Sequence, residues 1–254
     1  MIDPVAIEIG TFNIYWYGLI MAFAIILGFS LVIYLSEKVN ISAEFFLDFF
    51  IMGIPIGIIT ARIYFILFNF NYYIKNPLQI IAIWKGGLAI HGAIIGGLIV
   101  LIVLAKKRNI SFWKATDLIA PALILGQAIG RWGNFINQEA YGSIVSEEFI
   151  NKFPEVIKNQ MYIEGAYRHP TFLYESVWNL LMFILLIWLI NKEFTKKGDV
   201  FFTYLIGYSI GRFFIEELRT DSLMFLNMQV ARLTSVLLII FAIVMLYFRH
   251  RPKR

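Results

Sequence analysis

The sequence predicts an all-α membrane protein: seven transmembrane helices, an N-terminus outside, a cytoplasmic C-terminus and a small extracytoplasmic head insertion. Three compositional observations lead there first. Hydrophobic residues make up 59% of the chain, charged residues only 15%, and the mean hydropathy is +0.73. Typical soluble domains carry about 25% charged residues. A chain this apolar is neither a soluble globule nor a disordered polymer, so the bilayer is its expected solvent.

Seven mostly apolar stretches come close to the roughly 20 residues that a helix needs to cross the hydrocarbon core. In chain order they are 15–35, 45–68, 87–105, 115–130, 171–190, 198–217 and 228–248. The fourth is short and the sixth contains an arginine, Arg212. The first 14 residues hold no Lys or Arg, unlike the start of a cleaved signal peptide, so we expect the first span to be retained.

Basic residues alternate between the connecting segments. The segments 36–44, 106–114, 191–197 and 249–254 hold 12 Lys and Arg, whereas the remaining segments hold 7 in more than twice the length. The positive-inside rule therefore places the N-terminus outside and the C-terminus in the cytoplasm. We expect a single polytopic membrane domain over 1–254, with a polar head insertion at 131–170 between the fourth and fifth helices.

The net charge of +5 does not indicate a nucleic-acid partner, because the basic residues lie in short clusters between apolar spans. The chain has no cysteine, which excludes disulfides, thiolate metal sites and a cysteine nucleophile. Its three histidines lie in different segments without paired spacing, and no glycine-rich phosphate or dinucleotide motif is present. We expect no metal and no cofactor.

Polar residues from all seven predicted spans fall at one depth. They are Tyr17, Arg62, His91, Arg131, Tyr174, Glu175, Tyr208, Arg212 and Arg232. At about 1.5 Å per residue, a residue four to six positions inside a span lies about 6–9 Å below the outer rim, and the layer is at the level of outer-leaflet headgroups. Guanidinium groups bind phosphate through two parallel hydrogen bonds and stay charged in poorly hydrated sites. The layer therefore predicts a phosphate-binding cavity open to the outer leaflet.

Structural explanations compete for several members of this layer. An arginine near a helix end also snorkels to the interface, which is the alternative for Arg62 and Arg232. His91 has the alternative of a helix-packing histidine bonded to a carbonyl. For Arg212 a role in a functional site is favoured over snorkelling, because Tyr208 and Glu216 flank it at i−4 and i+4 on one helix face.

Three polar motifs concentrate this chemistry. They are GRWGNFINQEAYG at 130–142, HPTFLYE at 169–175 and YSIGRFFIEELRTDS at 208–222. The plain alternative for the first is a solvated loop, and the third is typical of an ion-pair network around Arg212. With YWYG at 15–18 and HGAIIGG at 91–97, these motifs make the whole chain resemble the prolipoprotein diacylglyceryl transferase family.

The resemblance implies an enzyme of the bacterial cytoplasmic membrane, multi-pass, with its active site toward the outer leaflet. Members transfer the diacylglyceryl group of phosphatidylglycerol to the lipobox cysteine of a prolipoprotein. The products are a thioether and glycerol 1-phosphate, in the first step of lipoprotein maturation. The donor is thus an anionic lipid, and the acceptor supplies the thiol that this chain lacks.

The resemblance also implies residue roles. Arg131 and Arg212 would clamp the phosphate, and His91 would be the general base. Arginine-promoted ionisation of the thiol, or a phosphate oxygen acting as base, are alternatives to His91. The expected donor-site residues are Tyr17, Asn134, Glu139, Gly142, Tyr208 and Glu216, the two tyrosines donating to headgroup oxygens and Glu216 orienting Arg212.

Two other functions would also place arginines in a membrane. A transporter or lipid translocator is one, but transporter sites tend to lie near the midplane between inverted repeats, and here the polar layer lies near one face with no visible repeat. A structural scaffold is the other, and it predicts loss of folding without any specific chemistry when the polar residues are replaced.

Overall fold

The computed structural model describes residues 1–10 and 12–251. Two basic residues of the predicted cytoplasmic tail, Lys253 and Arg254, lie outside the described residues. The long helices are α1 (Trp16–Lys38), α2 (Ala43–Phe68), α4 (Ile90–Lys107), α5 (Phe112–Asn137), α8 (Thr171–Ile190), α9 (Asp199–Leu218) and α10 (Val230–His250). Each coincides with one predicted span to within three residues at both ends, except that α5 runs seven residues past the predicted end.

Short elements connect the long helices. They are α3 (Phe70–Lys75), α6 (Glu147–Ile150), α7 (Glu155–Gln160) and the 3-10 turns η1 (Pro77–Gln79) and η2 (Ile83–Lys85). Three antiparallel hairpins join β1 (Val5–Ile9) to β2 (Phe12–Tyr15), β3 (Tyr162–Ile163) to β4 (Ala166–Tyr167), and β5 (Met224–Phe225) to β6 (Met228–Gln229).

Most of the long helices have the character of membrane spans. In the described part of the chain, α1, α2, α4, α8 and α10 are long and apolar enough to cross a bilayer, and at most a third of each apolar window is buried inside the protein. Apolar side chains that face outward in this proportion need a lipid solvent. The protein is therefore an all-α, multi-pass membrane protein. Helices α5 and α9 are as long but less apolar, and they carry Arg131 and Arg212.

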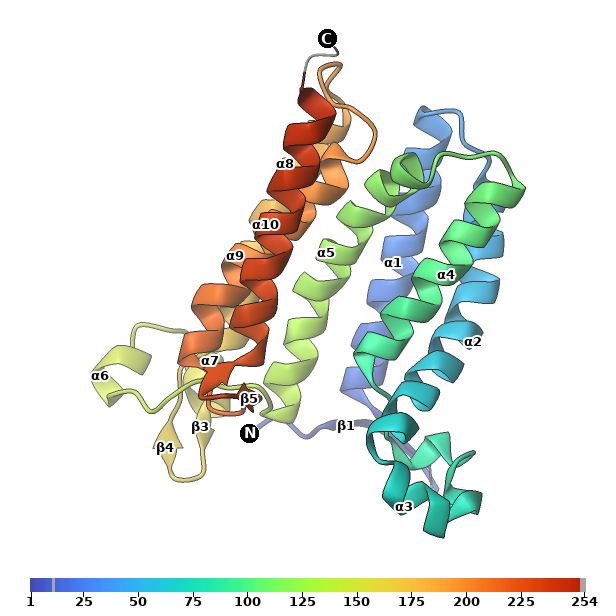
Figure 1. Ribbon diagram of the computed structural model, residues 1–254. Helices are drawn as coiled ribbons and strands as arrows, with labels where there is room; N and C mark the ends of the chain where they lie inside the picture. The colour runs from blue at the N-terminus through green and yellow to red at the C-terminus, as the bar shows by residue number, and fades with distance from the viewer. Residues whose placement is uncertain (11, 252–254) are drawn as a thin grey trace. The chain divides into compact units, whose positions relative to one another are not determined.

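The chain forms two compact units, which are described separately. The first contains residues 1–32 and 116–254, and the second contains residues 33–115 (Figure 1). The boundaries fall inside α1 and α5. The expected single domain over 1–254 stays a prediction.

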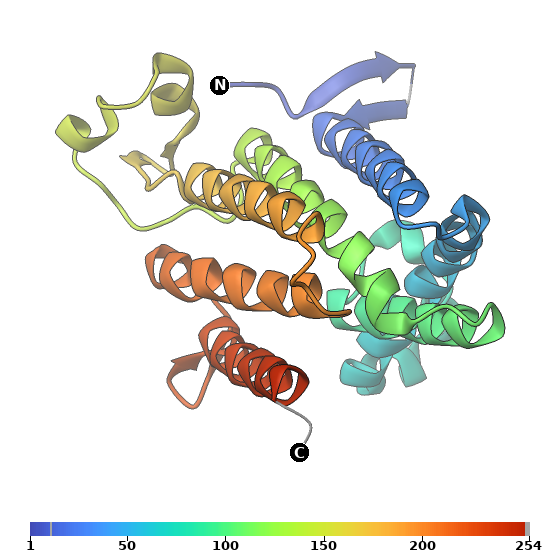
Figure 2. The same cartoon turned by 90° about the horizontal axis from the view of Figure 1, so that it is seen from above.

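In the first unit, α9 packs between α8 and α10 (Figure 2). Glycines allow α8 and α9 to approach closely: a Cβ at Gly207 would lie 2.0 Å from Cε of Met182, and one at Gly211 would lie 2.2 Å from Cδ1 of Trp178. The Trp178 indole donates to the carbonyl of Gly207 at 2.8 Å. This close packing fixes the two helices that carry Glu175 and Arg212.

The head follows the end of α5 and holds α6, α7 and the β3–β4 hairpin (Figure 1). Its small core contains Phe135, Ile150, Ile157, Met161, Ile163 and Phe172. Gln160, which is 1% exposed, donates to the carbonyls of Phe135 and Ile136 at 3.3 and 2.9 Å. The predicted insertion at 131–170 thus begins within α5, because the chain leaves the helix only where Gln138 and Ala140 adopt positive φ.

In the second unit, α2 and α4 pack against each other over most of their length. A Cβ at Gly92 would lie 2.4 Å from the carbonyl oxygen of Thr60, and one at Gly96 would lie 2.2 Å from Oγ1 of Thr60. The absence of side chains on these glycines therefore lets the two helix backbones come together.

Candidate active site

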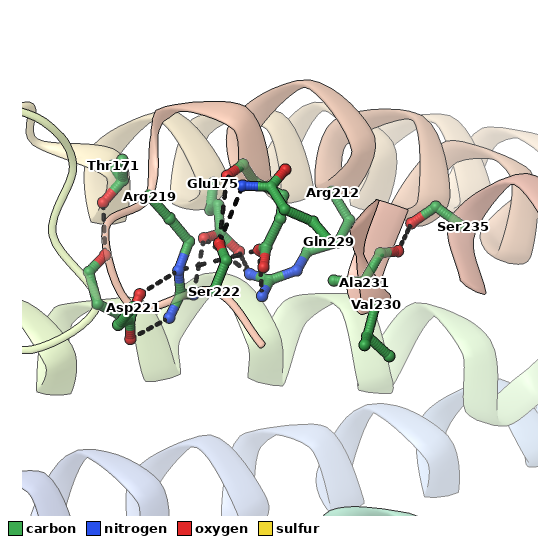
Figure 3. A network of polar contacts seen from close by, with 12 residues as sticks. Thr171, Glu175, Arg212, Arg219, Asp221, Ser222, Gln229, Val230, Ala231 and Ser235 are labelled. Carbon is green, nitrogen blue, oxygen red and sulfur yellow. Dashed lines mark hydrogen bonds and ion pairs between the residues drawn. The ribbon is translucent and has the colours of Figure 1, made fainter. Parts of the chain in front are cut away.

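Glu175 lies at the centre of a buried ionic cluster. It sits in the second turn of α8, and its side chain is only 5% exposed. Arg131 from α5 places Nη2 at 2.5 Å from its carboxylate, and Arg212 from α9 places Nη1 at 3.4 Å. Arg219, directly after α9, contributes Nη1 at 3.8 Å. Figure 3 shows Arg212 and Arg219 pointing towards Glu175. Three cations from two helices and a loop therefore share one carboxylate.

Two further carboxylates complete the cluster. Glu216 is 2% exposed and contacts Arg212 Nη2 at 2.5 Å, one turn away on α9. Asp221 accepts two hydrogen bonds from Arg219, Nε to Oδ1 at 2.9 Å and Nη2 to Oδ2 at 2.7 Å (Figure 3). We call Arg131, Arg212, Arg219, Glu175, Glu216 and Asp221 the arginine–carboxylate cluster. Its formal charges, three positive and three negative, cancel.

For Arg219 and Asp221, charge pairing affects the pKa more than burial does. Burial alone would lower the pKa of the Arg219 guanidinium, but the hydrogen bond to Asp221 and the charges of Asp221, Glu175 and Glu216 outweigh it and raise that pKa above its usual range. Burial alone would raise the pKa of Asp221, but the hydrogen bond and charge of Arg219 lower it overall. Both groups are therefore held in their charged forms.

Gly142 fixes the loop that carries Arg219. Its N–H donates to the carbonyl of His169 at 3.1 Å, and the next residue, Ser143, donates to the carbonyl of Leu218 at 2.8 Å. A Cβ at Gly142 would lie 2.6 Å from Cβ of His169 and 3.0 Å from the Leu218 carbonyl oxygen. Only glycine allows the chain after α5, the entry to α8 and the exit of α9 to meet here.

The other predicted donor-site residues of the first unit lie on α1, α5 and α9 and in the loop directly after α5. Asn134 Oδ1 accepts from Arg131 Nη1 at 3.4 Å. Glu139 is exposed and accepts from Nδ2 of Asn137 at 3.3 Å. Tyr17 packs so closely on α5 that a Cβ at Gly133 would lie 2.6 Å from its ring. Tyr208 stacks on Tyr204, with ring centroids 6.0 Å apart. The structure thus joins Arg131 to Asn134 and Arg212 to Glu216, and the two arginines meet at Glu175.

His91 belongs to the second unit. It lies in the first turn of α4, is exposed, and stacks on the ring of Tyr64 with centroids 5.8 Å apart. Its role as base stays a prediction.

Arg62 is neither a snorkelling residue nor a free phosphate ligand. It is 6% exposed, and every guanidinium nitrogen donates to a backbone carbonyl of the α2–α4 connection. Nε donates to Ile80 at 2.9 Å, Nη1 to Gly86 at 2.7 Å and Gly87 at 3.0 Å, and Nη2 to Gln79. Arg62 therefore organises the segment 69–89.

Three cluster residues were absent from the predicted site residues: Glu175, Arg219 and Asp221. The signal for Glu175 was present, because it is the only acidic residue in the 171–190 span and ionisable groups inside membranes are seldom idle. Arg219 lies inside the third charged motif, but spacing alone does not reveal that it turns back towards α8.

An apolar groove of about 450 Å³ is lined in part by residues that are next to cluster residues in the sequence. Residues of α1, α5 and α8 line it, among them Trp132 and Ser176, which directly follow Arg131 and Glu175 in the sequence. Trp132 Nε1 donates to Oγ of Ser176 at 3.2 Å. The first unit thus offers an apolar surface beside charged groups.

Fold and cluster together define a multi-pass α-helical membrane protein with an internal, charge-balanced arginine site. The chain belongs to the prolipoprotein diacylglyceryl transferase family, whose model matches residues 4–248. This confirms the family predicted from the motifs, and the chain is accordingly a transferase.

Relatives support this membership across the full length. The chain is 52% identical to the phosphatidylglycerol–prolipoprotein diacylglyceryl transferase of Oceanobacillus iheyensis, covering 98% of this chain and 89% of that protein. It is 48% identical to the enzymes of the same name from Bacillus cereus (strain G9842) and Bacillus thuringiensis subsp. konkukian (strain 97-27), covering 98% of this chain and 93% of each relative.

Proposed function

We propose that the chain transfers the diacylglyceryl group of phosphatidylglycerol to the lipobox cysteine thiol of a prolipoprotein, and that the arginine–carboxylate cluster is where this happens. A thioether forms and glycerol 1-phosphate leaves, the first step of bacterial lipoprotein maturation. The relatives' names supply donor and acceptor. The observation that carries the site is the convergence of Arg131, Arg212 and Arg219 on the buried carboxylate of Glu175.

The chemistry requires a thiolate and a stabilised leaving group. The acceptor thiol, with a reference pKa of about 8.5, loses its proton before it attacks the glyceryl carbon bonded to phosphate. A carbon–sulfur bond forms, the carbon–oxygen bond breaks, and the electron pair goes to the phosphate, which gains negative charge. Arg131 and Arg212 stabilise this charge through forked hydrogen bonds. Because carboxylates already hold them in place, little reorganisation is needed.

The remaining residues support these arginines or the headgroup. Asn134 orients Arg131 and Glu216 orients Arg212, in keeping with their contacts. Tyr17 and Tyr208 donate to headgroup oxygens, while Glu139 and Gly142 shape the donor site. His91 takes the thiol proton, because imidazole is the side chain that most often serves as a general base.

We further propose that all seven long helices span the bacterial cytoplasmic membrane, with the N-terminus outside, the C-terminus in the cytoplasm and the site toward the outer leaflet. Support comes from the match between predicted spans and long helices and from the uneven distribution of basic residues. The head over 131–170 is then extracytoplasmic. The apolar groove between α1, α5 and α8 accommodates an acyl chain of the donor while its phosphate meets the arginines.

A direct assay tests the function. Purified protein in detergent is mixed with phosphatidylglycerol and a lipobox peptide with one cysteine, and mass spectrometry scores the added diacylglyceryl group. We expect an adduct only with phosphatidylglycerol, a cysteine peptide and intact Arg131. Controls are a serine peptide, phosphatidylethanolamine and Arg131→Ala. A folded protein that binds phosphatidylglycerol but forms no adduct would instead support a lipid translocator.

The base assignment needs its own variant. His91→Gln retains a polar side chain and removes the titrating group, so we expect turnover to fall about 10²-fold or more while donor binding is unchanged. Near-normal turnover with full lipid binding would show that the thiol loses its proton by another route, such as arginine-promoted ionisation or transfer to a phosphate oxygen.

A further inference from the structure

We propose that Glu175 is a positioning residue that competes with the phosphate group for the cluster arginines and thereby drives release of glycerol 1-phosphate. This inference rests on the proposed function. It starts from one geometric fact: of the described carboxylates, Glu175 alone contacts Arg131, Arg212 and Arg219 together. Any group that binds these arginines must therefore share them with Glu175.

The reaction changes the charge of the bound group. The donor phosphodiester carries one negative charge, whereas the released phosphate monoester carries close to two at neutral pH, because its second pKa is about 6. The attraction between a phosphate and three guanidinium groups rises with that charge and is strong in a poorly hydrated site. Without a counter-charge, the product would be the tightest ligand of the site and would block further turnover.

The distances in the cluster describe how sharing works. Arg131 forms a close ion pair with Glu175 at 2.5 Å. Arg212 Nη1 donates to both carboxylate oxygens of Glu175 only at 3.4 Å, and Arg219 lies at 3.8 Å, distances too long for strong hydrogen bonds. Donor capacity is thus left on Arg212 and Arg219 while Glu175 stays in place. An entering phosphate takes these donors first.

The burial of Glu175 favours the recovery of its ion pair with Arg131. The side chain of Glu175 is 5% exposed, so a carboxylate separated from its arginines has little water to replace them, which is strongly unfavourable. Whenever the product draws Arg131 away, Glu175 is left underpaired. Its recovery of Arg131 favours departure of the dianion over retention.

The other two carboxylates do not fit this role. Glu216 is bound to Arg212 within α9, and it approaches Arg219 only to 3.9 Å. Asp221 holds Arg219 through two hydrogen bonds at the more exposed edge of the cluster. Neither contacts Arg131 among the ion pairs of the described residues.

Glu175→Gln tests the proposal, because it keeps the size and hydrogen-bonding capacity of the side chain and removes its charge. We expect the inhibition constant of glycerol 1-phosphate to fall about tenfold, and its directly measured dissociation constant to fall with it. A first turnover should be followed by a slower steady state, so that kcat falls while the KM for phosphatidylglycerol does not rise. A residue that only holds the arginines in place would weaken product binding.

Glu217→Gln is the matched control. Glu217 is the neighbouring acid on α9, its side chain is 64% exposed, and it pairs with Arg232 at 3.6 Å rather than with the cluster. We expect its product inhibition to equal that of the unchanged protein. Glu175→Asp retains the charge but draws the carboxylate back by one methylene, so we expect product binding about threefold tighter than in the unchanged protein. This variant carries the test if Glu175→Gln does not fold.

The outcomes are distinct. Unchanged or weakened binding of glycerol 1-phosphate in the folded Glu175 variants would overturn the inference. Absence of any thioether product from the unchanged protein would overturn the proposed function instead, and calorimetric binding of glycerol 1-phosphate to that protein and to Glu175→Gln would still show whether the carboxylate competes.

Discussion

Each compact unit contains an arginine site, and the two sites differ in the groups that accept hydrogen bonds from or pair with the guanidinium. Arg62 places all its guanidinium nitrogens on backbone carbonyls of the α2–α4 connection. Arg131 and Arg212 instead meet the carboxylates of Glu175 and Glu216. Carbonyl partners are neutral and belong to the fold, whereas carboxylate partners carry the charge of the ligand they resemble.

The difference indicates which arginines can bind a substrate. Replacing the carbonyls around Arg62 by a phosphate would undo the 69–89 segment and leave several carbonyls unpaired. Replacing one carboxylate of the cluster by a phosphate exchanges one anion for another, with most of the backbone left in place. The nature of the partner, rather than burial alone, therefore separates a structural arginine from a binding one.

The largest expected effect comes from replacing Arg131, one of the arginines paired with carboxylates. Arg131→Ala removes a donor from the charge that develops on the phosphate, so we expect kcat to fall about 10²- to 10³-fold in protein that remains folded. Diacylglyceryl transfer to the lipobox peptide measures it. Arg108→Ala is the control, because Arg108 forms an exposed pair with Asp48 and should retain full activity. Equal activity in both variants would remove Arg131 from the chemistry.

Replacing Arg62 should have the opposite effect: a loss of stability with turnover retained. Arg62→Ala removes the charged donor that binds the carbonyls of Gln79, Ile80, Gly86 and Gly87. A hydrogen bond to a charged group contributes about 1.5–3 kcal/mol, so we expect the free energy of unfolding to fall by about 3 kcal/mol or more. Arg62→Lys should recover little, since an ammonium lacks the planar fork. Unfolding in detergent, followed by circular dichroism, measures the loss. Turnover per folded molecule should stay within about twofold; a large loss of kcat at full stability would place Arg62 with the binding arginines.

A smaller effect is expected where the loop carrying Arg219 is anchored. Gly142→Ala forces a Cβ against backbone and Cβ atoms that cannot swing away, so we expect a loss of about 1–3 kcal/mol and weaker donor binding as Arg219 shifts. Gly126→Ala is the control within α5, because its Cβ would meet nothing within 4 Å and helix propensity favours alanine. If both variants behaved alike, the tight junction would not be what positions Arg219.

The sequence was sufficient to predict the long helices, since seven apolar stretches of membrane-spanning length leave little choice of structure. It also indicated that Arg131 and Arg212 have charged or polar partners, because ionisable groups in spans need them. It did not separate Arg62 from them. All three were predicted to lie at one depth, and the carbonyls that accept from Arg62 come from residues 17 to 25 positions later in the chain. Only the folded path of the connection brings them together.

Tertiary contact also decides the roles of Glu175 and Gly142. As an acid in an apolar span, Glu175 was visible, but its contact with three arginines depends on the meeting of α5, α8 and the end of α9. Gly142 resembled a donor-site residue, and the junction of three chain segments now gives it a packing role besides. Spacing along one helix carries no information about such meetings.

The smallest expected effect is a pH dependence that only the cluster should show. Asp221 has its pKa lowered below the ordinary 3.8: burial opposes this, and the hydrogen bond and charge of Arg219 outweigh it. A lowered folded pKa stabilises the protein above the unfolded value and loses that stabilisation as pH falls through the folded pKa. We therefore expect unfolding temperature to drop below about pH 4, and Asp221→Asn to lessen that drop. Arg62→Lys, whose partners do not titrate, should retain the full acid dependence. An equal drop in all three proteins would mean that the Arg219–Asp221 pair does not contribute to the loss of stability at low pH. The cluster would then be as insensitive to acid as the hydrogen bonds between Arg62 and its carbonyls.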